Sequence, residues 1–199
     1  MNDNKLKAEI DPLIRKIVSK LSIEPSSVEI SEQMKDAYQE GMDKAEVQFG
    51  VNFYPNLERV DVLEEMTFEN IKGMNEDLAN KLRQELQRGM LNFESVSKLK
   101  KRVKKVMDIG IERARMIART EFNRASNMGH IDGARQSNLK LMKRWDAHLD
   151  NRTSAICNAL DGKTIPLDKK FKYEGKEWDS PPSHPNCRSV LIFVEEGIE

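Results

Sequence analysis

The sequence predicts an α+β fold, with a mainly α-helical N-terminal two-thirds followed by a small mixed, loop-rich module with short antiparallel strands. Two observations support this class. Apolar residues recur at helical spacing as far as about residue 134, which is the pattern of amphipathic helices. Beyond that point the alternation ends, and glycine, proline and aspartate separate short apolar runs, which is typical of strands joined by turns.

The helical part is expected to contain five helices, because its apolar residues repeat every three or four positions. Thr67 can cap the third helix, and Gly110 marks a turn before the last one. Residues 50–61, which include Pro55, are expected to form a connection. The predicted helices span residues 6–21, 26–47, 67–90, 96–107 and 111–134.

The C-terminal module is expected to contain three short strands. The run around Trp145 mixes apolar and basic residues, and the last run is continuously apolar, as in a buried strand. The predicted strands span residues 139–148, 164–167 and 190–194. We therefore divide the chain into two predicted domains, an acidic helical region at residues 1–108 and a second domain at residues 109–199.

The 199 residues carry no formal net charge, but the charge is unevenly distributed along the chain. Residues 1–96 hold 12 Lys and Arg against 19 Asp and Glu, whereas residues 97–144 hold 14 against 4. This split predicts an acidic half that avoids polyanions and a basic middle that approaches them. No run reaches the roughly 18 apolar residues of a membrane span, so we expect no membrane partner. Two cysteines favour free thiols or metal ligands over a disulfide framework.

A basic helix face in the middle of the chain is a candidate DNA-binding surface. Lysines on one face can neutralise phosphates, which gives salt-dependent affinity without sequence preference. Because no aromatic residue lies among them, double-stranded DNA is the expected partner rather than a stacked single strand. The alternative is a solvated helix face with no partner. The residues are Lys98, Lys100, Lys101, Arg102, Lys104 and Lys105.

Cys157, His184 and Cys187 form a candidate metal site, because zinc takes thiolate and imidazole ligands tetrahedrally. A structural zinc site has four ligands, and His148 or Asp150 can supply the fourth. The alternative is that both cysteines are small buried apolar residues and that His184 forms hydrogen bonds within its proline-rich turn.

Three further motifs carry polar residues. On the last predicted helix, Glu121 can pair with Arg124, three positions away. Arg119 and Glu121 are then either ordinary surface residues or side chains that reach into the C-terminal module and hold its loops. The run Asp150-Asn151-Arg152-Thr153 can cap backbone amides, and Asp161-Gly162 is a turn signal.

In their order and spacing, these pieces resemble the head-morphogenesis domain of tailed viruses, a family typified by the F protein of phage Mu and the minor head protein of phage SPP1. The resemblance covers roughly residues 111–193. Relatives often carry cysteines where this chain has Ser154 and Ser189. The pieces are Ile117-Ala118-Arg119-Thr120-Glu121, Trp145, Asp150-Asn151-Arg152-Thr153, Cys157, Leu160-Asp161-Gly162 and Pro182-Ser183-His184-Pro185-Asn186-Cys187-Arg188.

The resemblance implies a minor capsid protein of a phage or provirus that associates with the portal and other capsid components and binds DNA. Its place is then the virion, in the capsid interior or at the portal vertex, with the host cytoplasm as the site of assembly. Zinc is the one cofactor expected. Some relatives carry C-terminal toxin domains, but this sequence ends at Glu199, so we expect no enzyme.

Two alternatives remain open at this stage. A metal-dependent nuclease or hydrolase would use His148, Asp150, Cys157, His184 and Cys187. A host-encoded DNA-binding module without a viral role would share the basic face.

Overall fold

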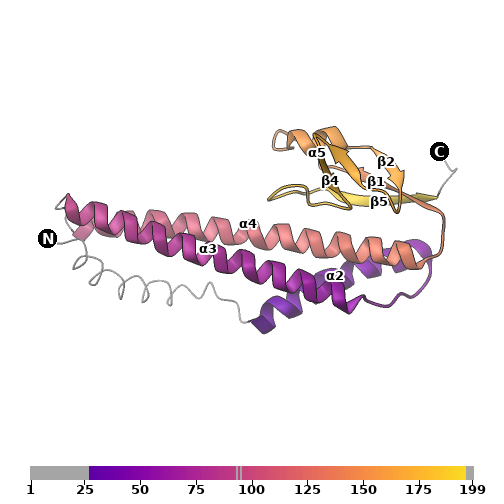
Figure 1. The fold of residues 1–199 in the computed structure, drawn as a ribbon, viewed down its shortest axis with the longest axis horizontal. Helices are drawn as coiled ribbons and strands as arrows, with labels where there is room; N and C mark the ends of the chain where they lie inside the picture. The colour runs from indigo at the N-terminus through magenta and orange to yellow at the C-terminus, as the bar shows by residue number, and fades with distance from the viewer. Residues whose placement is uncertain (1–26, 93, 95, 196–199) are drawn as a thin grey trace. The chain divides into compact units, whose positions relative to one another are not determined.

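The computed structural model of this chain describes residues 27–92, 94 and 96–195 and confirms the predicted α+β class (Figure 1). The helix predicted at residues 6–21 lies outside the described residues. The described chain forms two compact units. One, here called the hairpin unit, comprises residues 66–117. The other, called the module unit, comprises residues 29–65 and 118–195. The predicted boundary between residues 108 and 109 lies inside a helix, and the compact units divide the chain elsewhere.

Three long helices precede the sheet: α2 (Ser27–Phe49), α3 (Leu57–Leu91) and α4 (Val96–Gln136). The start predicted at Thr67 is wrong, since Thr67 is buried inside α3. Asn56 caps this helix instead, because its side-chain oxygen accepts a hydrogen bond from the Arg59 amide at 3.2 Å.

The turn predicted at Gly110 is also wrong, because α4 continues through it without a break. A Cβ atom at Gly110 would lie 2.9 Å from a methyl group of Leu78. This glycine therefore allows two helices to approach closely, and it does not end one of them.

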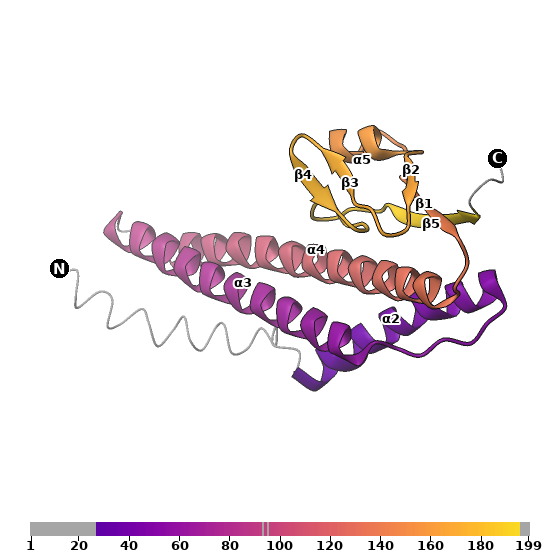
Figure 2. The same ribbon diagram turned by 45° about the vertical axis from the view of Figure 1, so that its right-hand side comes forward.

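In the hairpin unit, the N-terminal part of α4 lies antiparallel to α3 (Figures 1 and 2). Buried Met74, Leu78, Leu82 and Val106 form its apolar seam. Near the connection between the helices, Arg102 forms ion pairs with Glu85 at 2.5 Å and with Glu94 at 2.7 Å. These pairs hold the two helices together at their linked ends.

In the module unit, α2 crosses α4 at near backbone contact. A Cβ atom at Gly129 would lie 1.9 Å from the carbonyl oxygen of Tyr38, and one at Gly41 would lie 2.0 Å from that of Ser126. Beside the crossing, buried Asp132 accepts a hydrogen bond from the Tyr38 hydroxyl and pairs with Arg59, both at 2.7 Å. Only glycine fits at such a crossing, so these positions fix how α2 and α4 pack.

All three predicted strands are confirmed, as β1 (Leu141–Asp146), β2 (Thr164–Pro166) and β5 (Val190–Glu195). They form an antiparallel sheet in the order β2-β1-β5, with Trp145 opposite Leu191. In both views this sheet lies beside the C-terminal part of α4 (Figures 1 and 2). Its buried face carries Trp145, Leu191 and Phe193 into a core that also includes Ile131.

Two elements of the module were not predicted: the short helix α5 (Ala155–Leu160) and a hairpin of β3 (Phe171–Tyr173) and β4 (Lys176–Trp178). The hairpin turn is Glu174-Gly175, where both residues have positive φ, at 46° and 74°. Two positive φ values match the right-handed twist of the flanking strands.

The outer edge of β5 is occupied by side chains from two helices. Gln48 of α2 donates to the Phe193 carbonyl at 2.9 Å, and Asn127 of α4 accepts from the Leu191 amide at 3.0 Å. Next to them, the His130 ring packs edge-on to Phe193, and burial is the main reason that its pKa falls to about 4. Among the described helices, none has the length and apolar run that crossing a bilayer requires.

The glycine crossing gives a direct test. Replacing Gly129 with alanine should reduce the free energy of unfolding by about 1–3 kcal/mol, because the added methyl group has no room beside the Tyr38 carbonyl. The matched control is Gly73→Ala, a helical position with no atom within 4 Å of the new Cβ. It should stabilise the chain by about 0.5–1 kcal/mol, through helix propensity alone. Chemical denaturation followed by circular dichroism measures both, and equal effects would contradict the close packing.

Candidate functional site

Cys157, His184 and Cys187 come together in the module unit. Cys157 lies on α5, whose N-cap Ser154 accepts a hydrogen bond from the Cys157 amide at 3.2 Å. His184 and Cys187 lie on the loop between β4 and β5. The Cys157 Sγ atom lies 3.1 Å from His184 Nε2 and 3.6 Å from the Cys187 Sγ atom. The three predicted ligands thus present their donor atoms to one another, within 4.8 Å.

This donor set fits a zinc ion. Two thiolates bound at about 2.3 Å in a tetrahedral site lie about 3.7 Å apart, close to the observed 3.6 Å between the sulfur atoms. His184 directs Nε2 toward Cys157, while its Nδ1 lies 2.8 Å from the Pro185 carbonyl oxygen. Such a carbonyl contact orients a metal-binding imidazole and fixes its tautomer.

The predicted fourth ligands, His148 and Asp150, do not belong to this cluster. Both carboxylate oxygens of Asp150 are bound by Arg188, at 2.6 and 2.7 Å. His148 is exposed and lies 3.8 Å from Asp150. Serine hydroxyls surround Cys157 instead, with the Ser189 Oγ atom at 3.2 Å from its sulfur. The fourth donor available within the cluster is therefore a hydroxyl group.

The pKa values of the two thiols shift in opposite directions. A hydrogen bond with Cys187 lowers the pKa of the Cys157 thiol to about 4, and hydroxyls of Ser154, Ser189 and Ser183 lower it further against the effect of burial. The same hydrogen bond and burial raise the pKa of Cys187. Cys157 therefore gives up its proton more readily than Cys187, and a thiolate sulfur attracts a nearby cation.

Helix α4 holds the loop that carries His184 and Cys187. The hydroxyl of buried Thr120 accepts from the Asn186 amide at 2.9 Å. Asn123 donates to the carbonyls of Cys187 at 2.9 Å and Ser189 at 3.1 Å. Asn127 of α4 binds the Leu191 amide near the start of β5. Together these three side chains fix the loop on both sides of Cys187.

The residues considered from the sequence for holding the loops were Arg119 and Glu121, which flank Thr120 on α4. The predicted pair of Glu121 with Arg124 is confirmed, at 2.9 Å. Glu121 is buried, whereas Arg119 is exposed. The contacts described above come from Thr120, Asn123 and Asn127, although Arg119 and Glu121 were the residues considered for holding the loops. A polar residue every three or four positions was the available signal for this face.

The predicted Asp150–Thr153 loop is closed by its own side chains. Asp150 accepts from the Arg152 amide at 2.8 Å, and Thr153 Oγ1 accepts from the Asp150 amide at 2.7 Å. Arg188 binds Asp150 through two parallel hydrogen bonds, and these lower the pKa of the carboxyl. Arg188, next to Cys187, thereby links this loop to the cysteine loop.

The remaining motif residues have structural positions. Trp145 is fully buried and packs edge-on to Phe171, with ring centroids 5.1 Å apart. Asp161 ends α5 and accepts from the Ala147 amide at 2.8 Å. Gly162 has φ of 71° and donates to the Trp145 carbonyl at 2.8 Å. The predicted Asp161-Gly162 turn thus joins α5 to the sheet.

The ion pair between buried Lys143 and Asp179 was not predicted from the sequence. Lys143 of β1 is fully buried and binds both the carboxylate and the carbonyl of Asp179, which also pairs with Arg135 at 2.9 Å. Burial lowers the pKa of Lys143, and the Asp179 contact opposes that shift. A lysine on the apolar face of a predicted strand was the only signal.

The predicted basic face lies in the hairpin unit on α4, where its five lysines are exposed. Arg102 differs from them, because Glu85 and Glu94 already neutralise its charge. The lysines Lys98, Lys100, Lys101, Lys104 and Lys105 are therefore the part of this surface available to a polyanion.

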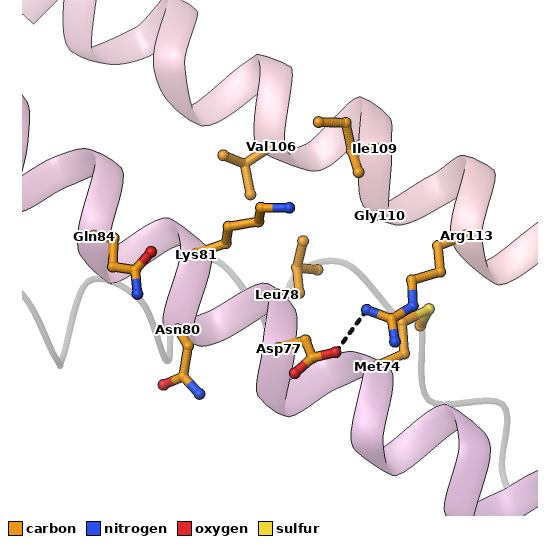
Figure 3. A pocket seen from close by; sticks show the side chains of 10 residues that line it. All are labelled: Met74, Asp77, Leu78, Asn80, Lys81, Gln84, Val106, Ile109, Gly110 and Arg113. Carbon is orange, nitrogen blue, oxygen red and sulfur yellow. Dashed lines mark hydrogen bonds and ion pairs between the residues drawn. The ribbon is translucent and has the colours of Figure 1, made fainter.

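A pocket of about 280 Å³ lies between α3 and α4 in the hairpin unit (Figure 3). Leu78 and Val106 line its apolar part, and Asp77 pairs with Arg113 at 2.7 Å beside them. Asp77 and Arg113 therefore neutralise each other's charge at this pocket.

Comparison with known proteins places these features among relatives. The family described as Phage Mu protein F like protein matches residues 78–192. The Minor head protein GP7 of Bacillus phage SPP1 is 35% identical over 130 residues, which are 61% of this chain and 42% of that protein. The NAD(+)--arginine ADP-ribosyltransferase EFV of Enterococcus faecalis (strain ATCC 700802 / V583) is 25% identical over 132 residues, 62% of this chain and 27% of that protein. The chain thus spans less than half the length of these two relatives. No solved structure is significantly similar to it.

The role of α4 in holding the loop can be tested at Asn127. Replacement by alanine should lower the free energy of unfolding by about 1–3 kcal/mol, because the buried Leu191 amide loses its acceptor. Asn158→Ala, at an exposed position of α5, is the control and should change stability by less than about 0.5 kcal/mol. Thermal and chemical unfolding measure both. An unchanged Asn127→Ala protein would mean that the loop is held elsewhere.

Proposed function

This chain belongs to the Phage Mu protein F like family, and from that membership we propose that it is a minor capsid protein that acts in phage head morphogenesis. The observation that carries the proposal is the family match over residues 78–192, which spans all of α4, α5 and the cluster of Cys157, His184 and Cys187. Similarity to the minor head protein of phage SPP1 supports the same role.

The contacts of the polar motif residues support a structural rather than an enzymatic role. Asp150 is bound by Arg188, and Thr120 and Asn123 bind backbone groups of the cysteine loop. Groups held in this way stabilise loops, and none of these three is left free to act on a substrate. We therefore propose that the chain is not itself an enzyme.

We place the chain in the virion, associated with the portal and other capsid components, with assembly in the host cytoplasm. The test is to express it with the portal protein of the same phage or provirus and to purify procapsids through the portal. Co-purification in a few copies per particle is expected. Procapsids that form normally without the chain, and never contain it, would overturn the proposal. A variant carrying Gly129→Ala reports whether incorporation requires the folded module unit.

Double-stranded DNA is the proposed second partner of the hairpin unit. Five exposed lysines occupy one side of α4 over residues 98–105, and such charges bind phosphates by releasing counterions. In the proposed role as a minor capsid protein, packaged DNA is the polyanion that this surface would meet.

The lysine surface has a matched control on the neighbouring helix. Changing Lys100, Lys101 and Lys104 together to glutamate should abolish DNA retention at low salt. In the unmodified chain each lysine contributes about 0.9 to the slope of log affinity against log salt. The control changes Lys72, Lys81 and Arg88 of α3 to glutamate, with the same change in net charge. If both triple variants lose DNA equally, net charge and not this face determines binding. Circular dichroism checks that both remain folded.

Zinc is the proposed ligand of Cys157, His184 and Cys187, with a neighbouring serine hydroxyl or water as fourth donor. The sulfur separation and the orientation of His184 support this assignment. When bound, the ion would tie α5 to the loop before β5, and thereby hold the two loops that Arg188 and Asp150 already connect.

Metal content and stability give the test. The purified chain should contain about one zinc per molecule, and chelation should lower its melting temperature. Cys187→Ser should lose the metal and also cost stability without metal, since a buried contact with Cys157 is removed. The control Asn158→Ala should retain the ion. Identical melting curves with and without chelator, together with metal-free protein, would rule the site out.

A further inference from the structure

We propose that Cys157 and Cys187 are a peroxide-sensitive pair that closes into a reversible disulfide, with Cys157 as the sulfur that the peroxide oxidises and Cys187 as the sulfur that completes the bond. This inference concerns covalent chemistry of the two thiols and does not rest on the proposed role in phage heads or on zinc binding.

Geometry supports the bond. The two Sγ atoms lie 3.6 Å apart, and both cysteines are reduced and buried, at 3% and 4% exposure. A disulfide requires the sulfurs to approach to about 2.05 Å, and side-chain rotation supplies a movement of this size. The partners come from α5 and from the loop before β5, thirty positions apart in sequence. They are therefore placed by the fold rather than by a short local turn.

Access distinguishes the two sulfurs. A pocket of about 10 Å³ opens on the cluster, and its lining includes Cys157, His184 and Ser189 but not Cys187. A space of this size holds about one water molecule. Hydrogen peroxide is the smallest two-electron oxidant of thiols, so it fits this opening far better than a peptide disulfide such as oxidised glutathione. Cys157 is consequently the cysteine of the pair that lines this opening.

The neighbours of Cys157 suit the first step. His184 Nε2 lies at 3.1 Å, and the Ser189 and Ser183 hydroxyls lie at 3.2 and 3.6 Å from the sulfur. These polar groups can hydrogen-bond the peroxide oxygens and a sulfenic acid oxygen, which an apolar pocket would not. The sulfur of Cys187 stands at the other side, ready for the second step.

The reaction balances in two steps. The Cys157 sulfur attacks one peroxide oxygen and the O–O bond breaks. The departing hydroxide leaves as water with the proton that the Cys157 thiol has given up, so that Cys157 becomes a sulfenic acid. The Cys187 sulfur then attacks the Cys157 sulfur, the S–O bond breaks, and the second water leaves with the Cys187 proton. Two thiols have lost two electrons and peroxide has become two waters. A dithiol reductant reverses the result by exchange.

The experiment treats the full chain with chelator and then with a small excess of hydrogen peroxide. Both thiols should disappear, the intact mass should fall by two hydrogens, and digestion should yield one peptide pair joined through Cys157 and Cys187. Dithiothreitol should restore both thiols. Oxidised glutathione at the same concentration should act at least about tenfold more slowly, because the pocket excludes it.

Single variants assign the roles of the two cysteines. With Cys187→Ser, peroxide should produce a sulfenic acid at Cys157 that dimedone traps. With Cys157→Ser, Cys187 should react with peroxide at least about tenfold more slowly, since it does not line this pocket. The wild-type thiol count keeps the test valid if a variant folds poorly. Thiols that survive in the chelated chain, bonds formed between two chains, or a Cys187 that is trapped as readily as Cys157 would overturn the inference.

Discussion

The structure of the module unit depends on the hydrogen bonds that α4 makes with the backbone of the last loop and strand. Thr120, Asn123 and Asn127 lie three or four positions apart, so their side chains emerge on one face of the helix. They bind the Asn186 amide, the Cys187 and Ser189 carbonyls, and the Leu191 amide in turn. Backbone groups along residues 186–191 are thereby hydrogen-bonded to side chains of one helix. The positions of Cys187 and Arg188 follow from this match, and with them the cluster of Cys157, His184 and Cys187 and the link to Asp150.

Several charged side chains in the module unit form ion pairs with one another. Asp132 accepts a hydrogen bond from Tyr38 and forms an ion pair with Arg59. Arg135 pairs with both Asp132 and Asp179, and Asp179 also binds the buried Lys143. Burying a single ion is expensive, but an alternating series of opposite charges offsets most of that cost. The series joins α2, α3 and α4 to β1 and to the end of β4. The buried ion pairs in this unit therefore stabilise its fold by connecting its helices to its strands.

How far the sequence could lead differs from element to element. The strands around Trp145 and at residues 190–194 were predictable because apolar runs between turn residues have few other uses. The Cys157, His184 and Cys187 cluster was predictable from residue type, since few other side chains share a preference for one soft ion. Gly110 misled because a glycine that packs against Leu78 looks the same in sequence as one that ends a helix. Asn123 and Asn127 were missed because an asparagine on a helix reveals its backbone partner only when the distant loop is in place. The basic face was visible in sequence, but the removal of Arg102 from it by Glu85 and Glu94 depends on tertiary contacts.

The occupied edge of β5 has a consequence for crowding. Gln48 and Asn127 occupy two of the outward backbone groups that another strand would need, at Phe193 and Leu191, and the opposite edge of the sheet is only three residues long and ends at Pro166. Neither side offers a template for a foreign strand. When copies are confined together at high concentration, this three-stranded sheet therefore gives little opportunity for intermolecular β-structure.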